Sequence, residues 1–374
     1  MVGEASGDLL AADLISRLPS THYKPFGICG PRMIAKGNCQ SIFPMEDLSV
    51  NGYTELLPKI FLILYRFIQT LWCIYALNPD VIVTVDSPGF NFPLVKTIRR
   101  FLKLKAKIIH YVAPTVWAYQ PERAKVCARL YDHMMVILPF EKKYFLEVGL
   151  KCDYVGNPAF NQIKPQSRRS KKLSRKTLSL SEDKILVCLF PGSRKSELVK
   201  HLPIIKNFID LMNKKYSNMV FFIPSVLNSK IFIQENLYSH NVLVAENNAM
   251  KEVMLDACDL IIAKSGTSVT ESICKLIPVI MFYKVSDITA WFIKRKIKVK
   301  YFTICNIVMG QPIIPELLQE DFNSSALVHL SEKLIFNKIA IKKQIQGMSL
   351  YKSKFYELDK NPKLSEDIIM RYCN

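Results

Sequence analysis

The chain has 374 residues, of which 49% are hydrophobic and 22% are charged. These proportions exclude a largely disordered chain, and the length suits two domains of roughly 150–200 residues better than one. The net charge of +19 favours anionic partners such as nucleic acid, anionic lipid or phosphorylated substrates.

The ten cysteines and six histidines predict neither a disulfide framework nor a zinc site. No cysteines have CxxC spacing and no histidines form an HxxxH pair. We therefore expect reduced thiols, mostly in the core, and no metal ion held by the protein.

The first motif in chain order is the run GEASGD at residues 3–8, which precedes a helical pattern. Small residues let a ligand approach the backbone, and a helix amino terminus suits an anion or a hydroxyl-rich group. Glu4 would then present a carboxylate to the ligand. Ser6 or Asp8 can also cap the following helix, and the two roles are compatible.

Residues 60–77, IFLILYRFIQTLWCIYAL, are long enough to span a membrane. Arg66 would lie at the centre of that span, which costs ~2.5–3.5 kcal/mol. Lys59, Arg66 and Cys73 form a narrow polar stripe beside a broad apolar face. This favours a helix in the membrane surface, with a plain buried helix as a close alternative. The residues expected to face lipid are Phe61, Leu64, Phe67, Ile68, Leu71 and Trp72.

Eight apolar runs, separated by helical patterns, predict parallel strands that are covered on both faces. They are Val81–Val85, Ile108–Val112, Met134–Leu138, Ile185–Phe190, Met219–Ile223, Val242–Ala245, Leu260–Ala263 and Val279–Phe282.

The apolar pattern breaks near residues 158–184, where residues 164–176 read KPQSRRSKKLSRK. We expect a basic linker over 164–184 between domains 1–163 and 185–348, with a C-terminal helix over 349–374 that packs back on the first domain. The predicted fold is α/β, with two doubly wound, Rossmann-like domains and a cleft between them. No aromatic residue interleaves the linker's charges, so we do not expect nucleic acid as a partner.

Ligands of open parallel sheets bind beyond the carboxyl ends of the strands, so polar turns after apolar strands are the candidate sites. Asp86 closes the strand VIVTVD, and a partly buried carboxylate there suits general-base work on a hydroxyl. Capping of the next turn through Ser87 or Gly89 explains an aspartate at this position equally well.

Two further turns suit phosphate. In PGSRKSE, residues 191–197, Gly192 and Ser193 offer backbone amides, and Arg194 offers a guanidinium fork, although a surface turn with a solvated arginine is the alternative. In SGTSVTE, residues 265–271, Gly266 and Thr267 would open a helix toward a diphosphate.

Glu271 shares a helix face with Thr267 and could accept the hydroxyls of a ribose. A capping box of Ser268 and Glu271 fits the same spacing. Two phosphate turns in the second domain and carboxylates in the first describe a nucleotide-sugar transferase. Arg194, Lys195 and helix amides could neutralise the leaving diphosphate without a metal ion.

Together these motifs resemble those of the lipid-A-disaccharide synthase family over nearly the whole chain. The resemblance implies a GT-B fold and a metal-independent, inverting transfer of 2,3-diacylglucosamine from UDP to 2,3-diacylglucosamine 1-phosphate, with no cofactor. It also implies a peripheral protein on the cytoplasmic face of the inner membrane of a Gram-negative bacterium, and it is compatible with a homodimer. The matching segments are GEASGD, CGPRM, LSVNGYTELLPKI, PDVIVTVDSPGFN, HYVAPTVWAYQPER, LPFEKKYF, FPGSRKSE, SGTSVTE and YFTICNIVMG.

The resemblance also implies roles for single residues. Asp86 matches the family's essential acid, and Arg194 matches its essential arginine at the donor diphosphate. Other positions of its binding motifs are matched by Glu4, Ser265, Gly266, Thr267, Glu271 and Asn306. The family's acyl-chain substrates suit the apolar residues 60–77 and a second, basic stretch over residues 288–301 with Trp291 and Phe292.

Two alternatives stay open at this point. One is another GT-B transferase that uses a UDP-sugar and a different lipid-linked acceptor. The other is a catalytically impaired homologue, because only Met1 and Val2 precede the first motif where the family has a hydrophobic strand.

Overall fold

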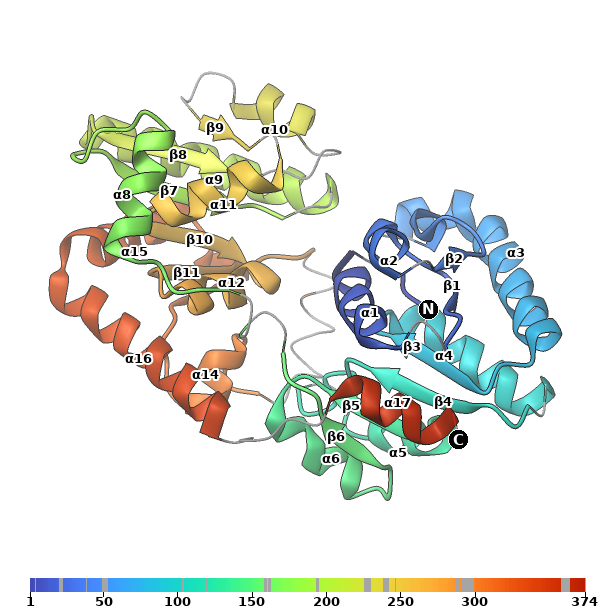
Figure 1. Cartoon of the computed structure of the whole chain (residues 1–374). Helices are drawn as coiled ribbons and strands as arrows, with labels where there is room; N and C mark the ends of the chain where they lie inside the picture. The colour runs from blue at the N-terminus through green and yellow to red at the C-terminus, as the bar shows by residue number, and fades with distance from the viewer. Residues whose placement is uncertain are drawn as a thin grey trace. The chain divides into compact units, whose positions relative to one another are not determined.

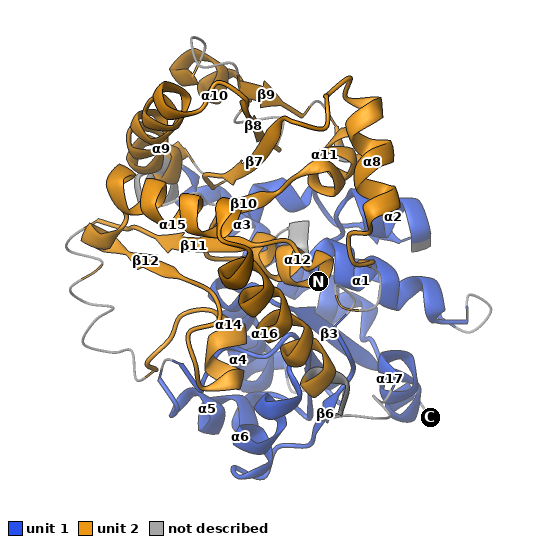
Figure 2. Ribbon diagram, turned by 90° about the vertical axis from the view of Figure 1, so that its left-hand side faces the viewer, with its two compact units in different colours: residues 1–158, 357–374 blue, residues 159–356 orange. Residues whose placement is uncertain are grey.

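The computed structural model divides the chain into two compact units, which are coloured separately in Figure 2. Unit 1 comprises Met1–Pro158 with Glu357–Asn374, and unit 2 comprises Ala159–Tyr356. The structure describes the chain except residues 4, 20–22, 38, 49–52, 103, 119, 158–159, 161–162, 193–194, 225–229, 238–241, 246, 287–289, 291–298, 358–363 and 374.

Unit 2 is built on a parallel sheet of six strands in the order β12-β11-β10-β7-β8-β9 (Figure 1). In chain order within the unit this is 6-5-4-1-2-3, the order of a Rossmann-type doubly wound sheet. Its topological switch point lies between β7 and β10, where Phe190 is opposite Ala263. The strands are β7 (Ile185–Phe190), β8 (Met219–Ile223), β9 (Val242–Val244), β10 (Leu260–Lys264), β11 (Val279–Tyr283) and β12 (Glu316–Leu318).

The helices of unit 2 lie on both sides of this sheet, because its central strands are apolar throughout and need cover on each face. Leu186–Leu189 and Leu260–Ala263 are fully buried. The helices are α8 (Arg168–Thr177), α9 (Lys195–Lys215), α10 (Lys230–Leu237), α11 (Asn248–Ala257), α12 (Thr267–Lys275), α14 (Ile304–Met309), α15 (Ser324–Phe336) and α16 (Lys338–Glu357).

Unit 1 holds a parallel sheet β3-β4-β5-β6 and a short parallel pair β1-β2. Its strands are β1 (Phe26–Gly27), β2 (Gln40–Ser41), β3 (Val81–Val85), β4 (Lys107–Tyr111), β5 (His133–Val136) and β6 (Cys152–Tyr154). Its helices are α1 (Ala5–Arg17), α2 (Pro31–Gly37), α3 (Tyr53–Leu77), α4 (Pro88–Thr97), α5 (Arg123–Leu130), α6 (Lys142–Leu146) and α17 (Ser365–Cys373).

Residues Met1–Gly3 join the two sheets of unit 1 by backbone hydrogen bonds. The Val2 amide donates to Ile28 O at 3.1 Å, while the Val85 amide donates to Met1 O at 3.0 Å. The segment therefore lies where the first strand of a doubly wound sheet belongs, between β1 and β3. The switch point of unit 1 then falls between Gly3 and the end of β3.

Asp8 of the GEASGD motif caps a helix, although not the one that follows it. Its buried carboxylate accepts the amides of Arg32 at 2.9 Å and Met33 at 3.0 Å, which open α2. A Cβ on Gly30 would lie 2.3 Å from Cγ of Asp8, so glycine is required there for close approach. The motifs GEASGD and CGPRM are thus locked together.

All eight predicted strands are confirmed, with ends that differ by at most two residues. The prediction of a basic linker over 164–184 is wrong. Its residues 168–177 form α8, which is capped by Ser167, packs against α11 and belongs to unit 2. Sequence periodicity missed α8 because the face that it buries carries Ser174 and Arg175 instead of apolar residues.

The prediction of a C-terminal helix on the first domain is confirmed for α17. Its Ser365 and Glu366 contact Arg17 of α1, and the hydroxyl of Tyr372 lies 3.1 Å from Nδ1 of His133. The helix over 349–374 is not one element, since α16 ends at Glu357 and α17 begins at Ser365.

The side chains of Cys29 and Cys39 lie against each other, and the expectation of reduced cysteines stays a prediction. The parallel pairing of Phe26 with Gln40 and of Gly27 with Ser41 brings the two cysteines together. Among the other cysteines, six are buried and Cys73 and Cys373 are half-buried.

Candidate functional site

The two phosphate-suited turns of unit 2 lie side by side. β7 and β10 are neighbours, and both turns follow the carboxyl ends of these strands. The ammonium of Lys264, at the end of β10, donates to Glu197 Oε1 in the first turn of α9 at 2.7 Å. This ion pair ties one turn to the other at the switch point, where doubly wound sheets bind ligands.

The backbone conformation at Gly192 favours glycine. Its φ is 113°, which an L side chain rarely adopts, and the Glu197 carboxylate packs against it. Buried His201 contacts the start of this turn, because its Nδ1 lies at hydrogen-bond distance, 2.6 Å, from Pro191 O. Ser193 and Arg194, the next residues of this turn, lie outside the described residues.

Gly266 is the N-cap of α12 and leaves the helix amino terminus open. Within the part of the chain that the structure describes, no side chain caps α12 and no atom lies within 4 Å of a Cβ at Gly266. The alternative capping box of Ser268 and Glu271 is therefore wrong. Gly266 and Thr267 are exposed and Ser265 is half-buried, so first-turn amides are accessible to an anion.

Glu271 forms an ion pair that sequence reasoning missed. Nζ of Lys251, on α11, donates to both carboxylate oxygens of Glu271 at 2.9 Å each. The same ammonium lies 5.8 Å from the ring centroid of Phe190, the last residue of β7. Only their folding brings Lys251 and Glu271 together, since 20 residues separate them in sequence.

Asn306 has a structural role that the motif match did not predict. It is fully buried, its Nδ2 donates to Ile314 O and to Glu316 at 2.8 Å, and its Oδ1 accepts the amides of Ile313 and Ile314 at 2.9 Å. These four hydrogen bonds use the full capacity of the amide, so the side chain has none left for a sugar nucleotide.

In unit 1, Asp86 lies at the carboxyl end of β3 in a strained backbone. Asp86, Ser87 and Val112, at the ends of β3 and β4, have φ values of 48°, 46° and 70°. Non-glycine residues at positive φ cost of order 1–3 kcal/mol each and cluster at functional sites. Asn91 holds the turn, since its Nδ2 donates to Asp86 O at 2.8 Å.

The GEASGD motif lies against this turn. A Cβ on Gly3 would be 2.6 Å from Oγ of Ser87, so the Ser87 side chain packs directly on the Gly3 backbone at the switch point of unit 1. The structure thus brings Gly3 of the GEASGD motif next to the turn that contains Asp86. Glu4 itself lies outside the described residues.

Helix α3 turns its apolar face outward. Phe61 and Trp72 are 81% and 68% exposed, and Leu64 and Ile68 are exposed with them. Arg66, by contrast, faces the protein and pairs with Asp47 at 2.8 Å. The exposure of the apolar face excludes the alternative of a plain buried helix. Phe67 and Leu71 are half-buried, and the ring of Phe67 packs on Phe90, so these two predicted contacts face inward.

Within the described residues one helix, Lys59–Leu77, is long and apolar enough to cross a membrane by length and composition, and 11% of that window is buried. Trp291 and Phe292 of the second candidate stretch lie outside the described residues. No group of three metal-ligating side chains is found among the residues that the structure describes.

Glu141 is a buried carboxyl that sequence reasoning did not single out. Trp117, from the motif HYVAPTVWAYQPER, donates Nε1–H to Glu141 Oε1 at 3.0 Å. Burial raises the pKa of Glu141 to about 8. The two motifs that contain these residues are thus connected inside unit 1 by a carboxyl that is largely neutral below that pH.

We expect Glu141→Gln to remove a pH dependence of stability. Because the folded pKa exceeds the unfolded one, the contribution of this carboxyl to stability is complete below about pH 4.5 and is lost as the pH rises through 8. The free energy of unfolding of the variant, relative to wild type, should rise by about 1.4 kcal/mol per pH unit between pH 5 and 8. Denaturant titrations at several pH values measure this. Glu147→Gln, at an exposed site after α6, is the control, and parallel curves for wild type and Glu141→Gln would refute the expectation.

The model of the lipid-A-disaccharide synthetase family matches residues 1–368. Lipid-A-disaccharide synthase of Rickettsia felis is 32% identical over 97% of this chain and 92% of its own length. That of Rhodospirillum centenum is 33% identical over 93% of this chain and 87% of its own length.

Two solved structures show the same fold at low sequence identity. UDP-GlcNAc 2-epimerase from Neisseria meningitidis, bound to UDP-GlcNAc, has a TM-score of 0.61 and 16% identity, and the match covers 96% of this chain and 98% of that one. HepE of Anabaena, in complex with UDP and glucose, has a TM-score of 0.56 and 12% identity, with 99% and 96% covered.

Proposed function

Because the chain belongs to the lipid-A-disaccharide synthase family, we propose that it transfers 2,3-diacylglucosamine from UDP to 2,3-diacylglucosamine 1-phosphate. The protein is a hexosyltransferase of GT-B fold with a role in lipid A disaccharide synthesis. The family match over residues 1–368 supports this transfer over one to a different lipid-linked acceptor.

The observation that carries the proposal is the pair of turns at the switch point of unit 2. Gly192 and Gly266 both place backbone amides beyond the carboxyl ends of adjacent strands. We assign the diphosphate to these amides and to Arg194. We assign the ribose to Glu271, which would exchange one of its contacts with Lys251 for the sugar hydroxyls.

In unit 1 we assign the acceptor hydroxyl to Asp86. The carboxylate takes the proton of the 6-hydroxyl while that oxygen bonds to the anomeric carbon of the donor. The bond from that carbon to the diphosphate oxygen breaks, UDP leaves with its electron pair, and the configuration inverts. Glu4 is a second carboxylate that we propose for the same turn.

The test is an assay in detergent micelles with the UDP donor and the diacylglucosamine phosphate acceptor. We expect equal amounts of disaccharide 1-phosphate, detected by mass spectrometry, and UDP. A second arm replaces the acceptor with a lipid-linked sugar diphosphate. Turnover of that acceptor alone, or UDP release without a disaccharide, would overturn the proposal.

We propose further that the protein lies on the cytoplasmic face of the inner membrane through α3. Phe61, Leu64, Ile68 and Trp72 form an exposed apolar stripe, whereas the helix's arginine pairs with Asp47 on the protein side. A helix of this kind lies in the interface with its apolar face in the acyl boundary. The charge of +19 supports an anionic surface as the partner.

We expect Phe61→Ser/Trp72→Ser to weaken co-sedimentation with anionic vesicles by about tenfold or more, since it removes two large apolar contacts. Turnover of micellar substrates should fall less than vesicle binding. Val199→Ser/Ile231→Ser changes two exposed apolar residues that are not part of α3 and serves as the control. Unchanged sedimentation of the α3 variant would contradict the assignment.

A further inference from the structure

A pocket of about 710 Å³ lies at the end of the unit 2 sheet opposite the candidate donor turns. It is floored by Lys184 and Ile185, Asp259 and Pro278, which precede or begin β7, β10 and β11. The donor turns follow the other ends of these strands, about five residues and ~17 Å away. The pocket is therefore separate from the proposed transfer site, and its volume suits an organic ligand.

One wall of this pocket is cationic. It is a stripe of α8 with helical spacing, formed by Arg168, Lys171, Lys172 and Arg175. Lys171 and Arg175 both form ion pairs with Asp259. Arg168 is exposed, and the Lys172–Glu182 pair is 78% and 77% exposed, a setting in which ion pairs contribute little.

The sequence around this wall adds to its positive potential. Residues 164–176 carry seven basic side chains and no acidic one. Asp259 is neutralised by Lys171 and Arg175. The cations that remain, Arg168 and Lys172, face solvent, so an anion can bind them by displacing water.

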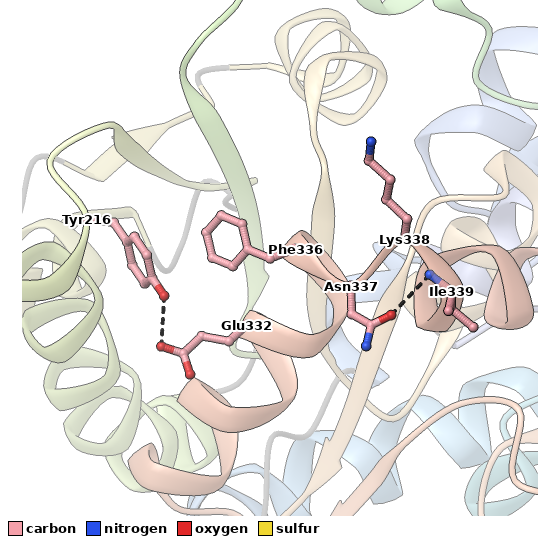
Figure 3. A pocket seen from close by; sticks show the side chains of 6 residues that line it. All are labelled: Tyr216, Glu332, Phe336, Asn337, Lys338 and Ile339. Carbon is pink, nitrogen blue, oxygen red and sulfur yellow. Dashed lines mark hydrogen bonds between the residues drawn. The ribbon is translucent and has the colours of Figure 1, made fainter.

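The opposite wall is apolar. It consists of the end of α15 and one face of α16, on which Ile341 and Ile345 are four residues apart. Phe336, 47% exposed, closes α15 and lies beside Tyr216 with ring centroids 5.0 Å apart (Figure 3). Ile339, just beyond, is 81% exposed. The apolar lining comprises Ile185, Leu276, Pro278, Leu334, Ile335, Phe336, Ile341 and Ile345.

The neighbouring pocket of about 640 Å³, on the other side of Phe336, has a different character. Its Glu332 accepts hydrogen bonds from Tyr216 at 3.0 Å and from Lys215 at 2.8 Å, as Figure 3 shows for Tyr216. Its lining has one basic residue, Lys338, against one acidic residue, Glu332, so it offers no excess of positive charge. The lining of the α8 pocket has five basic residues against three acidic ones, Glu182, Asp183 and Asp259. The combination of cationic and apolar walls belongs to the α8 pocket.

We propose that the α8 pocket binds an anionic phospholipid, with its phosphate at Arg168 and Lys172 and an acyl chain along Ile341, Ile345 and Phe336. A ligand with one anionic end and one apolar end matches both walls, whereas a free phosphate matches one and a neutral amphiphile the other. The site is additional to the transfer site and does not depend on the proposed function.

The probe is lysophosphatidylglycerol below its micelle concentration, with binding followed by native mass spectrometry and calorimetry. We expect one lipid to bind per chain, more tightly than lysophosphatidylcholine and far more tightly than inorganic phosphate. Equal binding of the phosphatidylcholine analogue would overturn the role of the cationic wall. Equal binding of inorganic phosphate would overturn the role of the apolar wall.

Two variants locate the lipid. Arg168→Glu/Lys172→Glu should weaken binding about thirtyfold or more, given about fivefold per basic residue near an anionic headgroup. Its matched control, Lys206→Glu/Lys343→Glu, changes the net charge equally at exposed sites outside the lining and should bind as wild type. Ile345→Asn tests the apolar wall, with Leu350→Asn on the same helix as its control.

Transfer activity in detergent separates this site from the proposed function. Arg168→Glu/Lys172→Glu should retain wild-type turnover while it loses the lipid. If lysophosphatidylglycerol instead binds both wall variants normally and is displaced by the acceptor substrate, it occupies the transfer site and the proposal is refuted.

Discussion

Asp86→Asn lowers the turnover of disaccharide formation by about 10²–10⁴-fold and leaves donor binding within about twofold of wild type. That range is the usual contribution of a general base positioned on its proton. Asparagine is the informative replacement because Asp86 has a φ of 48°, a conformation that asparagine tolerates and alanine does not. The change therefore removes the base without adding backbone strain.

The measurements for this variant are single-turnover kinetics with both lipid substrates and calorimetry with UDP. Asp80→Asn is the control, since it makes the same change at an exposed site near the opposite end of β3. If Asp86→Asn keeps near-normal turnover, another group takes the proton. If it loses UDP binding as well, its effect is not confined to the acceptor.

The sheets were the most predictable part of the fold. A strand buried on both faces must be apolar throughout, so the four-residue run Leu186–Leu189 signals its place directly. The edge strands β6 and β12 gave no such signal. β6 and β12 are three residues long, and β12 begins with Glu316, whose carboxylate accepts the Phe302 and Thr303 amides.

The candidate site was predictable where its chemistry resides in the backbone. Gly192 and Gly266 have positive φ values, a conformation that favours glycine. A glycine directly after an apolar strand therefore indicates such a turn from the sequence alone. Side-chain roles were harder to predict, because they depend on partners distant in sequence. Lys251 contacts Glu271 only because α11 and α12 pack together. Asn306 matches a binding motif, but its side-chain amide is hydrogen-bonded to Ile313, Ile314 and Glu316.

The two sheets have the same aspartate–arginine pair at the amino ends of their strands, a feature that the sequence pattern did not predict. In unit 1 an aspartate before β5, Asp132, accepts the Ile108 amide of the neighbouring strand at 2.8 Å and pairs with Arg99. In unit 2 an aspartate before β10, Asp259, accepts the Leu186 amide at 2.8 Å and pairs with Arg175. In both units the pair fixes the register of two central strands from their amino ends.

Arg175→Met therefore destabilises unit 2 by about 3–5 kcal/mol, the usual penalty for removing one partner of a buried ion pair. The Arg175 side chain is 8% exposed. Besides pairing with Asp259, its guanidinium donates to four backbone carbonyls, those of Ala257 at 3.3 Å, Ser181 at 3.4 Å, Glu182 at 3.2 Å and Lys184 at 2.8 Å. Methionine restores the packing of the stem but leaves these acceptors without their donor.

Thermal unfolding measures the effect, and we expect the transition of unit 2 to shift downward by about 10 °C. Arg169→Met is the matched control, because it removes the same charge from an exposed position of the same helix and should shift the transition by no more than a degree or two. Equal shifts for the two variants would mean that Arg175 acts only as a surface charge. A large shift for Arg175→Met alone would show that a segment with the composition of a linker is structurally part of the domain that it precedes.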